Sequence, residues 1–529
     1  MIRLLDCTLR DGGFVNDWLF GKETIRSIFR RLNRAGVDIV EAGFLDERRE
    51  SDEDRSINPR LSDFDSALRG IARKSQVVLM IDYGTVAAEN IPAADKTSID
   101  GFRVIFKKKD AAAALAFCRA LKEKGYFVSV QPVSVTTYSD AEMLDLIAGV
   151  NAFSPDAVSI VDTYGLLHRE KLMHYFRLLD RNLGAQTAIG FHSHNNFQMA
   201  YANCMEILKA RTSRDLIVDS SCYGMGKSAG NACTELLAMH LNDRFRKNYA
   251  IEEILEIIDS DIIKIYEKSR WGYACDYYIS ALSKAHPQYV QYLEKKKTLP
   301  VSGVLAVLSR IPESKKLAFD RTLIERLYRD YQEKDLDDTD AVSKLTALLK
   351  DREVLLLGPG TSILKYKDDI LQTIAGKNAV VIGVNCAPDA VPADYVFISN
   401  AKRYEQLVDT LLKNDRKVIA SSNVSPIDAP FDFVVNFAKL TTPDAKVADN
   451  AIIMALRGLV LAGVDHVMLA GFDGFSARQD NFYNPYMEFL NPPDDFDLRN
   501  REIAKDLKSL ETKIRLTFVT PSRYPLLMK

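Results

Sequence analysis

Short, almost wholly apolar runs alternate with helix-like stretches over the first 225 residues of the chain. Runs of this length, rich in β-branched residues, are typical of strands that are covered on both faces. We expect eight such strands, at residues 3–8, 38–44, 77–83, 101–106, 127–133, 157–163, 188–194 and 216–222. Amphipathic stretches such as 23–35, 110–124 and 197–210 lie between most of them. This alternation predicts a (β/α)8 barrel, although the number of strands alone would also fit a doubly wound sheet.

The pattern becomes helical after about residue 250, with expected helices at 251–268, 277–284, 289–296 and 321–334. We therefore assign residues 1–290 to the barrel and residues 291–349 to a helical linker. These helices have both apolar and charged faces, which is more than a short linker needs. We expect them to provide the contacts of a homodimer.

A second α/β region begins at Glu353, after the acidic boundary at 335–340. Strand-like runs at 353–357, 379–384, 395–398, 417–420 and 466–469 are separated in part by helical stretches. This order predicts a Rossmann-like domain over residues 350–529. The whole chain is thus expected to be an α/β protein with two domains and a helical connection.

Composition narrows the choice of function. The 529 residues include 70 Lys and Arg and 72 Asp and Glu, a net charge of -2, which argues against nucleic acid or a membrane surface as a partner. No stretch approaches the roughly 18 apolar residues of a membrane helix. The chain enters a strand directly after Met1, which leaves no room for a signal peptide. Seven cysteines without a C-x-x-C pair indicate a reduced, cytoplasmic protein.

Three motifs fall at the carboxyl ends of predicted strands, where barrel active sites are built. They are D-C-T-L-R-D-G-G at 6–13, H-S-H-N-N at 192–196 and G-M-G-K-S-A-G-N at 224–231. His192 and His194 are two residues apart on a strand, so their side chains share a face and can reach one ion. Asp11 lies at a neighbouring strand end and completes a set that suits Mn²⁺ or Mg²⁺, with Zn²⁺ as a third option.

These three motifs resemble the signatures of the metal-dependent barrel lyases and acyltransferases. That superfamily includes hydroxymethylglutaryl-CoA lyase, isopropylmalate and homocitrate synthases and 4-hydroxy-2-oxovalerate aldolase. V-D-I-V-E-A-G at 37–43 resembles the second strand of the family, and D-T-Y-G at 162–165 resembles its sixth. The resemblance extends over about residues 1–290 and specifies the superfamily rather than one reaction.

The resemblance implies a role for each matching residue. Asp11, His192 and His194 would bind the metal, with Asn231 as a fourth ligand, and Arg10 would stabilise the oxygen of a metal-bound enolate. Glu41 would either face the site as a catalytic residue or orient Arg10. At the sixth strand end, Asp162 and Thr163 would contact the substrate, although Asp162 is equally suited to capping the next turn.

Two positions depart from the family pattern. The oxovalerate aldolases have a catalytic histidine shortly after the metal aspartate, where this chain has Phe14. The lyases use a cysteine on the loop before the asparagine, and Cys222 lies at about that spacing, either as a catalytic group or as a buried strand-end residue. We therefore expect an aldolase or lyase acting on a 2-oxo acid. A Claisen-type acyltransferase that uses acyl-CoA is the alternative from the same superfamily.

In the second domain, a glycine-containing turn follows the first strand, with Gly358, Gly360, Thr361 and Ser362 placed to hold a phosphate. The same residues would also suit a tight strand-to-helix turn. Together with Asn385 and Asp473, the turn resembles bacterial sialyltransferase-like and motility-accessory domains. That resemblance implies a nucleotide or nucleotide-sugar ligand and a place in surface polysaccharide synthesis. A third hypothesis follows, a nucleotide-sugar glycosyltransferase whose barrel is only a scaffold.

Overall fold

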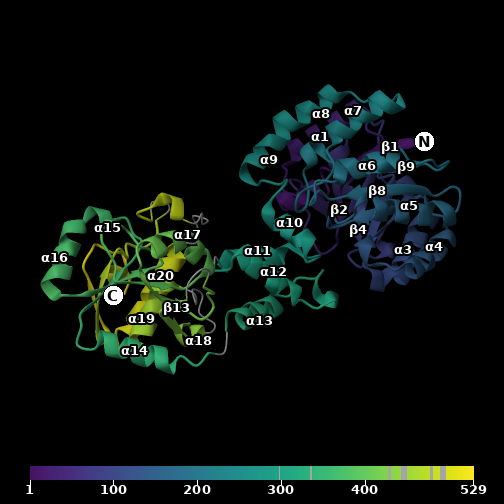
Figure 1. Cartoon of the computed structure of the whole chain (residues 1–529). Coiled ribbons are helices and arrows are strands. Elements are labelled where there is room, and N and C mark those ends of the chain that lie inside the picture. The colour runs from purple at the N-terminus through teal and green to yellow at the C-terminus, as the bar shows by residue number, and fades with distance from the viewer. Residues whose placement is uncertain are drawn as a thin grey trace. The chain divides into compact units, whose positions relative to one another are not determined.

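The computed structural model describes residues 1–296, 298–333, 336–426, 430–441, 450–476, 481–488 and 496–528. The chain divides into two compact units, Met1–Pro287 and Gln288–Lys529. Figure 1 shows the first unit as strands ringed by helices and the second as a sheet between helices. The division lies close to residue 290, where the sequence places the end of the barrel.

The first unit is a closed parallel barrel. Its strands are β1 (Ile2–Asp6), β2 (Ile39–Leu45), β4 (Gln76–Asp82), β5 (Gly101–Phe106), β6 (Phe127–Pro132), β7 (Ala157–Asp162), β8 (Ala188–Ser193) and β9 (Leu216–Ser220). The sheet closes because β1 pairs in parallel with both β9 and β2. A two-residue strand, β3 (Ile57–Asn58), pairs only with the end of β2. The predicted (β/α)8 barrel is confirmed.

Helices cover the outside of this barrel. They are α1 (Lys22–Ala35), α2 (Leu61–Leu68), α3 (Ala111–Glu123), α4 (Asp140–Asn151), α5 (Arg169–Asn182), α6 (Ala200–Leu208), α7 (Thr234–Phe245), α8 (Ile251–Ile257) and α9 (Ile263–Lys268). The next helix, α10 (Cys275–Leu282), contacts Phe197 in the loop after β8 through Tyr278. In α1, Ile25, Ile28, Phe29 and Leu32 recur at helical spacing and are buried against the strands. The helix ends at Gly36, whose φ of 79° gives the left-handed cap that glycine adopts without strain.

The inside of the barrel is built in two layers. Apolar side chains, including Leu5, Ile39, Val78, Ala157, Ala188 and Ile217, form one buried cluster. Two residues further along several of the same strands lie Glu41, Ser159 and Asp219, all buried. Because side chains alternate across a strand, residues two apart point to the same side. A polar layer therefore lies next to the apolar one, on the side of the strand ends that carry the motifs.

The second unit contains one parallel sheet. Its strands are β10 (Val354–Leu357), β11 (Val380–Val384), β12 (Tyr395–Ile398), β13 (Lys417–Ser421), β14 (Phe433–Val435), β15 (His466–Ala470) and β16 (Arg515–Phe518). Their order is β14-β13-β12-β11-β10-β15-β16, as expected for a Rossmann-like fold. β14 and β16 are not among the strands predicted from the sequence. β14 has only three residues, and β16 is an edge strand whose residues alternate between exposed and half-buried, unlike a buried run.

The helices of this unit are α11 (Pro287–Lys296), α12 (Val301–Ser309), α13 (Arg321–Gln332), α14 (Thr339–Leu349), α15 (Ser362–Lys365), α16 (Lys367–Lys377), α17 (Ala401–Lys413), α18 (Phe437–Leu440), α19 (Ala451–Leu461), α20 (Phe496–Leu510) and α21 (Tyr524–Leu527). Leu345 and Leu349 of α14 are buried in the same core as the strand residue Leu356. Asp338, just before α14, accepts a hydrogen bond of 2.9 Å from the backbone N–H of Asn436. We assigned α14 to the linker from the sequence, but it packs as part of the C-terminal core.

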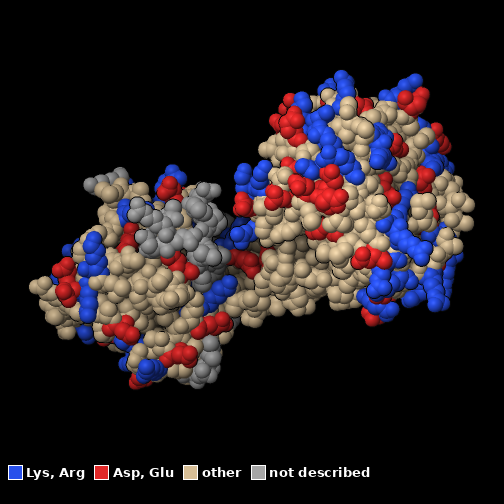
Figure 2. All heavy atoms as spheres, turned by 90° about the horizontal axis from the view of Figure 1, so that it is seen from above, with Lys and Arg blue, Asp and Glu red and all other residues tan. Residues whose placement is uncertain are grey.

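Charge is distributed in mixed patches. On the face shown in Figure 2, Lys and Arg lie among Asp and Glu, in keeping with a net charge of -2. Within the described ranges, no helix has both the length and the apolar character needed to cross a membrane.

The packing of α14 predicts where a stable C-terminal fragment begins. A fragment of residues 337–529 should be more stable than one of residues 350–529, because the second lacks Leu345 and Leu349. Burial of each leucine contributes about 1.5–3 kcal/mol. Urea denaturation followed by circular dichroism would measure the difference. Equal unfolding midpoints for the two fragments would contradict the role given to α14.

Candidate metal centre

Three buried side chains meet at the carboxyl ends of β1 and β8. Asp11, His192 and His194 each offer a ligand atom, and these atoms all lie within 4.8 Å of one another. Asp11 follows β1, His192 belongs to β8, and His194 directly follows it. The structure thus brings together the three residues that the sequence selected as metal ligands.

The turn after β1 fixes Asp11. The carbonyl oxygen of Cys7 accepts hydrogen bonds from the backbone N–H groups of Arg10, at 3.1 Å, and Asp11, at 2.8 Å. Burial would raise the pKa of the Asp11 carboxyl, but Arg10 and then His194 and His192 lower it well below its usual range. Asp11 is therefore ionised at neutral pH, as a metal ligand must be.

The two histidines are held in forms that can bind a cation. Nδ1 of His192 lies 3.0 Å from Oδ2 of Asp219, so the carboxylate can hold the Nδ1 proton and leave Nε2 for an ion. Burial lowers the pKa of His194 to about 4, so that its imidazole is neutral at pH 7. A neutral imidazole has the free lone pair that ligation requires.

Asn231 joins the site from the glycine loop. The backbone of Asn231 forms an isolated antiparallel β-bridge with that of His194. Its side-chain Nδ2 donates a hydrogen bond of 2.8 Å to Oδ2 of Asp11. Its Oδ1 is buried and has no hydrogen-bond partner among the described residues. A buried oxygen without a partner beside one carboxylate and two imidazoles fits a divalent cation. At Gly226, a Cβ would lie 2.5 Å from Oδ2 of Asp11, so the close approach of this loop requires glycine.

Arg10 and Glu41 form a buried ion pair behind the ligands. Nε of Arg10 donates a hydrogen bond of 2.6 Å to Oε2 of Glu41, while Nη1 of Arg10 bonds to Oδ1 of Asp11. Glu41 is fully buried. Of the two interpretations offered by the sequence, this geometry matches the carboxylate that orients Arg10.

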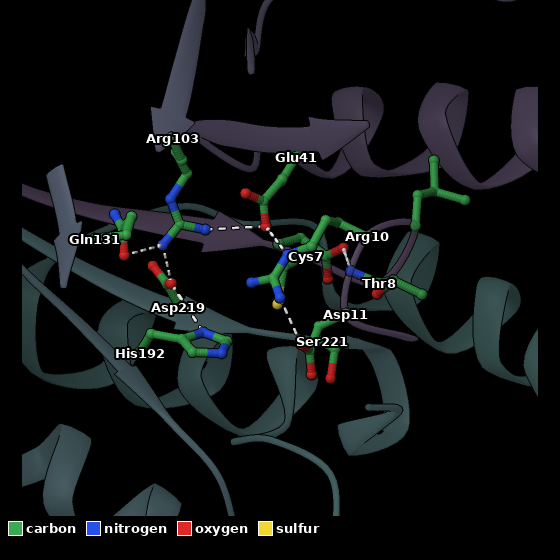
Figure 3. A network of polar contacts seen from close by, with 12 residues as sticks. Cys7, Thr8, Arg10, Asp11, Glu41, Arg103, Gln131, His192, Asp219 and Ser221 are labelled. Carbon is green, nitrogen blue, oxygen red and sulfur yellow. Dashed lines mark hydrogen bonds and ion pairs between the residues drawn. The ribbon is translucent and has the colours of Figure 1, made fainter. Parts of the chain in front are cut away.

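Two residues of this network, Arg103 on β5 and Asp219 on β9, are not among the site residues predicted from the sequence. Figure 3 shows Arg103 between Glu41 and Asp219, with Asp219 also facing His192. The sequence did contain a sign of their role, because each is a charged residue in a mostly apolar strand, GFRVIF for Arg103 and LIVDS for Asp219. A charged side chain in such a strand is buried on folding and needs a partner of opposite charge.

Aromatic side chains and a lysine lie beside the metal ligands. Nε1 of Trp18 donates a hydrogen bond of 2.7 Å to the carbonyl oxygen of Arg10, and its ring packs edge-on against Phe14. Nζ of Lys227 lies 5.4 Å from the centre of the Phe14 ring, and the Lys227 backbone N–H donates to Asp11 at 3.2 Å. A cation thus lies near the position where the oxovalerate aldolases have their histidine.

The predicted substrate contacts Asp162 and Thr163 take part in local turns. Asp162 accepts backbone hydrogen bonds from Leu166, at 2.7 Å, and Leu167, at 3.0 Å. Burial raises the pKa of Asp162 to about 6, against the effect of these two bonds. Oγ1 of Thr163 accepts a hydrogen bond of 2.7 Å from the backbone N–H of Ser134. Both side chains shape the loops after β6 and β7.

Cys222 is fully buried, and its Sγ lies 3.5 Å from Oδ2 of Asp6. Burial, and then the neighbouring Asp6, raise the pKa of the Cys222 thiol well above its ordinary value. A reactive cysteine has the opposite character, with a lowered pKa and access to the site. The environment of Cys222 is that of the buried strand-end cysteine that the sequence offered as its second interpretation.

The glycine turn of the second unit holds a carboxylate of the chain itself. Asp473, after β15, accepts a hydrogen bond of 2.8 Å from the backbone N–H of Ser362, and also bonds to the hydroxyls of Ser362 and Thr361. A Cβ at Gly360 would lie 2.5 Å from the carbonyl oxygen of Gly471, and one at Gly358 would lie 2.6 Å from it. Close packing of two loops therefore accounts for both glycines, and a phosphate at this turn would have to displace Asp473.

Asn385 lies at the end of β11 and bonds to the end of β12. Its Nδ2 donates to Oγ of Ser399 at 2.9 Å, and its Oδ1 accepts from the Ser399 backbone N–H at 3.0 Å. Both polar atoms of the Asn385 side chain are therefore hydrogen-bonded to Ser399. The nucleotide-binding role assigned to Asn385 and to the glycine turn stays a prediction.

Comparison with known proteins agrees with this geometry. Residues 1–260 match the HMGL-like family. The chain is 26% identical over 264 residues to the 4-hydroxy-2-oxovalerate aldolase of Roseiflexus castenholzii, a match that spans 49% of this chain and 75% of that protein. It is 24% identical over 277 residues to the oxaloacetate decarboxylase of Mycobacterium tuberculosis, with 52% and 79% covered.

Among solved structures, the chain is similar to the N-terminal domain of a candidate aldolase from Bacteroides vulgatus. That match has 21% identity and a TM-score of 0.48, and it covers 55% of this chain and 96% of that one. The HMGL-like match over residues 1–260 agrees with the superfamily that the sequence motifs indicated.

We predict that the purified protein binds about one divalent ion per chain at this centre. The double variant His192→Ala/His194→Ala should lose that ion, because a single carboxylate and an amide oxygen hold a cation weakly. Metal content after dialysis against Mn²⁺ would be measured by inductively coupled plasma mass spectrometry, with thermal unfolding as the test of folding.

A matched control is His174→Ala/His240→Ala, which removes two histidines outside the cluster. This control should keep wild-type metal content. Retention of the ion by the His192/His194 variant would place the metal site elsewhere.

Proposed function

We propose that the barrel is a divalent-metal-dependent aldolase or lyase that makes or breaks a carbon–carbon bond next to the carbonyl of a 2-oxo acid. The observation that carries the proposal is the buried trio of Asp11, His192 and His194 with the Arg10 guanidinium bonded to Asp11. The 4-hydroxy-2-oxovalerate aldolases and the oxaloacetate decarboxylase that the chain resembles support the same class of chemistry.

Charges at the site favour an anionic substrate. Burial by itself would lower the pKa of the Arg10 guanidinium, but Glu41 and then Asp11 raise that pKa above its usual value, so that Arg10 carries a fixed positive charge. A cation held in a buried site can stabilise negative charge that develops on the substrate oxygen. The Lys227 ammonium, beside the ring of Phe14, adds a second positive group that can bind a carboxylate.

Asp11, His192 and His194 would hold the metal ion, with Oδ1 of Asn231 as a further oxygen ligand. When bound, the ion would supply Lewis-acid polarisation of the 2-oxo group. Glu41 orients Arg10, and Asp219 orients His192. Trp18 is buried against the turn that holds Arg10, and Arg10 itself is 5% exposed, so the electrostatic effect of its guanidinium is screened little by water.

A carbon–carbon lyase and an acyl-CoA-dependent transferase would share this site, so a direct assay must separate them. We expect Mn²⁺-dependent release of pyruvate from at least one member of a panel of 4-hydroxy-2-oxo acids and oxaloacetate. Loss of activity with a chelator, and its return with Mn²⁺, should accompany it. Thiol release from acetyl-CoA in the parallel assay, without pyruvate release, would instead support the acyltransferase.

Lys227 should affect substrate affinity more than turnover, because it lies beside the ligands and would contact the anionic group of the substrate. Lys227→Met should raise KM about tenfold, the value for loss of roughly 1.4 kcal/mol of binding, with little change in kcat. Lys227→Arg should restore most of the affinity.

The control for this variant is Lys247→Met. Lys247 also lies beside an aromatic ring, with its Nζ 5.8 Å from the centre of the Tyr249 ring, but it pairs with Asp38 before β2, at the opposite end of the barrel. Steady-state kinetics of both variants give the comparison. Equal KM values for Lys227→Met and the wild type would show that Lys227 does not bind the substrate.

For the C-terminal unit we propose a fused ligand-binding domain whose ligand lies where the strand order reverses, between β10 and β15. Ligands of open parallel sheets bind at such a point. Its ligand, a nucleotide or nucleotide-sugar by resemblance, would have to compete with Asp473. The homodimer expected from the helices after the barrel is likewise a proposal.

A further inference from the structure

Two buried carboxylates at the metal centre are each shared between two partners. Oε2 of Glu41 accepts a hydrogen bond of 2.6 Å from Nε of Arg10 and lies 2.9 Å from Nη1 of Arg103. Oδ2 of Asp219 pairs with Nη2 of Arg103 and lies 3.0 Å from Nδ1 of His192. Figure 3 shows that Arg103 is the group common to both carboxylates.

Stability alone gives a poor account of Arg103. The residue is 1% exposed and has its guanidinium inside the barrel, where a charge loses its hydration. Desolvation of a buried ion pair offsets most of the Coulomb gain, and apolar replacements of such pairs are often neutral or stabilising. An arginine in this place therefore needs a reason other than the stability of the fold.

Its geometry provides that reason. A guanidinium is planar and rigid, and its two Nη groups point in fixed directions, so the positions of the two carboxylates are set relative to one another. One carboxylate holds the arginine that bonds to Asp11, and the other faces a metal-ligating histidine. Lysine has a single charged nitrogen and cannot hold both carboxylates in one plane.

We propose that Arg103 is a positioning residue that fixes His192 and Arg10 at the same time. It contacts neither the substrate nor the metal and acts only through Asp219 and Glu41. This inference rests on the proposed function for the role of Arg10, whereas its effect on His192 concerns metal binding alone. The two halves of the network can therefore be separated by experiment.

Each half makes its own prediction. Asp219→Asn should weaken metal binding, because it alters the carboxylate that faces His192. Glu41→Gln should lower kcat and leave metal affinity near the wild-type value, because it frees Arg10 while Asp219 still pairs with Arg103. Arg103→Met should do both, since it removes the group that the two carboxylates share.

The test uses the full-length protein. Mn²⁺ affinity of the metal-free protein would be measured by calorimetry, the ligand field by the visible spectrum of the Co²⁺ form, and kcat and KM with the best substrate of the panel. Arg103→Met should bind Mn²⁺ 10- to 100-fold more weakly, the usual effect of losing an outer-shell partner, and should shift the Co²⁺ spectrum. Arg103→Lys should recover only part of each property.

Arg214→Met is the matched control. Arg214 is also a poorly exposed arginine of the barrel, but among the described residues it pairs with a single carboxylate, that of Asp180, and otherwise donates to backbone carbonyls, including those of Leu183 and Thr187. This variant should lower the unfolding temperature without changing the Co²⁺ spectrum or the Mn²⁺ affinity.

Wild-type Mn²⁺ affinity and an unchanged Co²⁺ spectrum in folded Arg103→Met would overturn the proposal. If that variant does not fold, the same two measurements on Arg103→Lys and Asp219→Asn decide the question. A wild-type protein that binds Mn²⁺ but releases no product from the panel would reject the proposed function. The metal affinities and spectra would still test the link from Arg103 to His192.

Discussion

The compensation of buried charge inside the barrel is the constraint on which the site depends. Arg10, Glu41, Arg103 and Asp219 are each at most 5% exposed, so none can be stabilised by water. Each of the two arginines contacts two carboxylates. Glu41 contacts both arginines, and Asp219 contacts Arg103 and His192. Removal of one member leaves an unpaired buried charge, which is far more costly than the intact network. The ligand geometry is therefore fixed by the same contacts that make the charges tolerable.

The sequence predicted the barrel and the meeting of Asp11, His192 and His194 because both follow from local patterns. Strands covered on both faces are apolar throughout, and His192 and His194 share a face through their spacing alone. Arg103 and Asp219 are 116 residues apart and meet only because the sheet closes on itself. Their partnership depends on the register of strands around the whole barrel, which no local pattern contains. Whether Glu41 acts on the substrate or orients Arg10 likewise depends on which strands neighbour each other in the closed barrel.

The second unit shows how one motif can have two explanations. A glycine turn after a strand predicts a phosphate site because its N–H groups are free, and in this chain one of them bonds to Asp473, 111 residues later. Close approach of the loops at Gly360 and Gly471 requires glycine in either case. The two glycines are thus accounted for by the close approach of two loops, and the phosphate site that the sequence predicted at this turn stays a prediction. α14 was misplaced for a related reason, because its two buried leucines have their partners only in the folded sheet.

The layered interior explains why these charges lie where they do. Leu5, Ile39, Val78 and Ile217 close the barrel below the polar layer, so the charged groups have apolar contacts on that side. The low polarity of these surroundings strengthens each ion pair. The charged side chains are also kept from rotating, because any other arrangement would leave a charge without a partner. Towards the strand ends the same groups lead to Asp11 and the two histidines. In the proposed function, the barrel thus presents a cation-binding face that the buried charges orient from beneath, and the loops above it, with Phe14 and Lys227, would select the anionic group of the substrate.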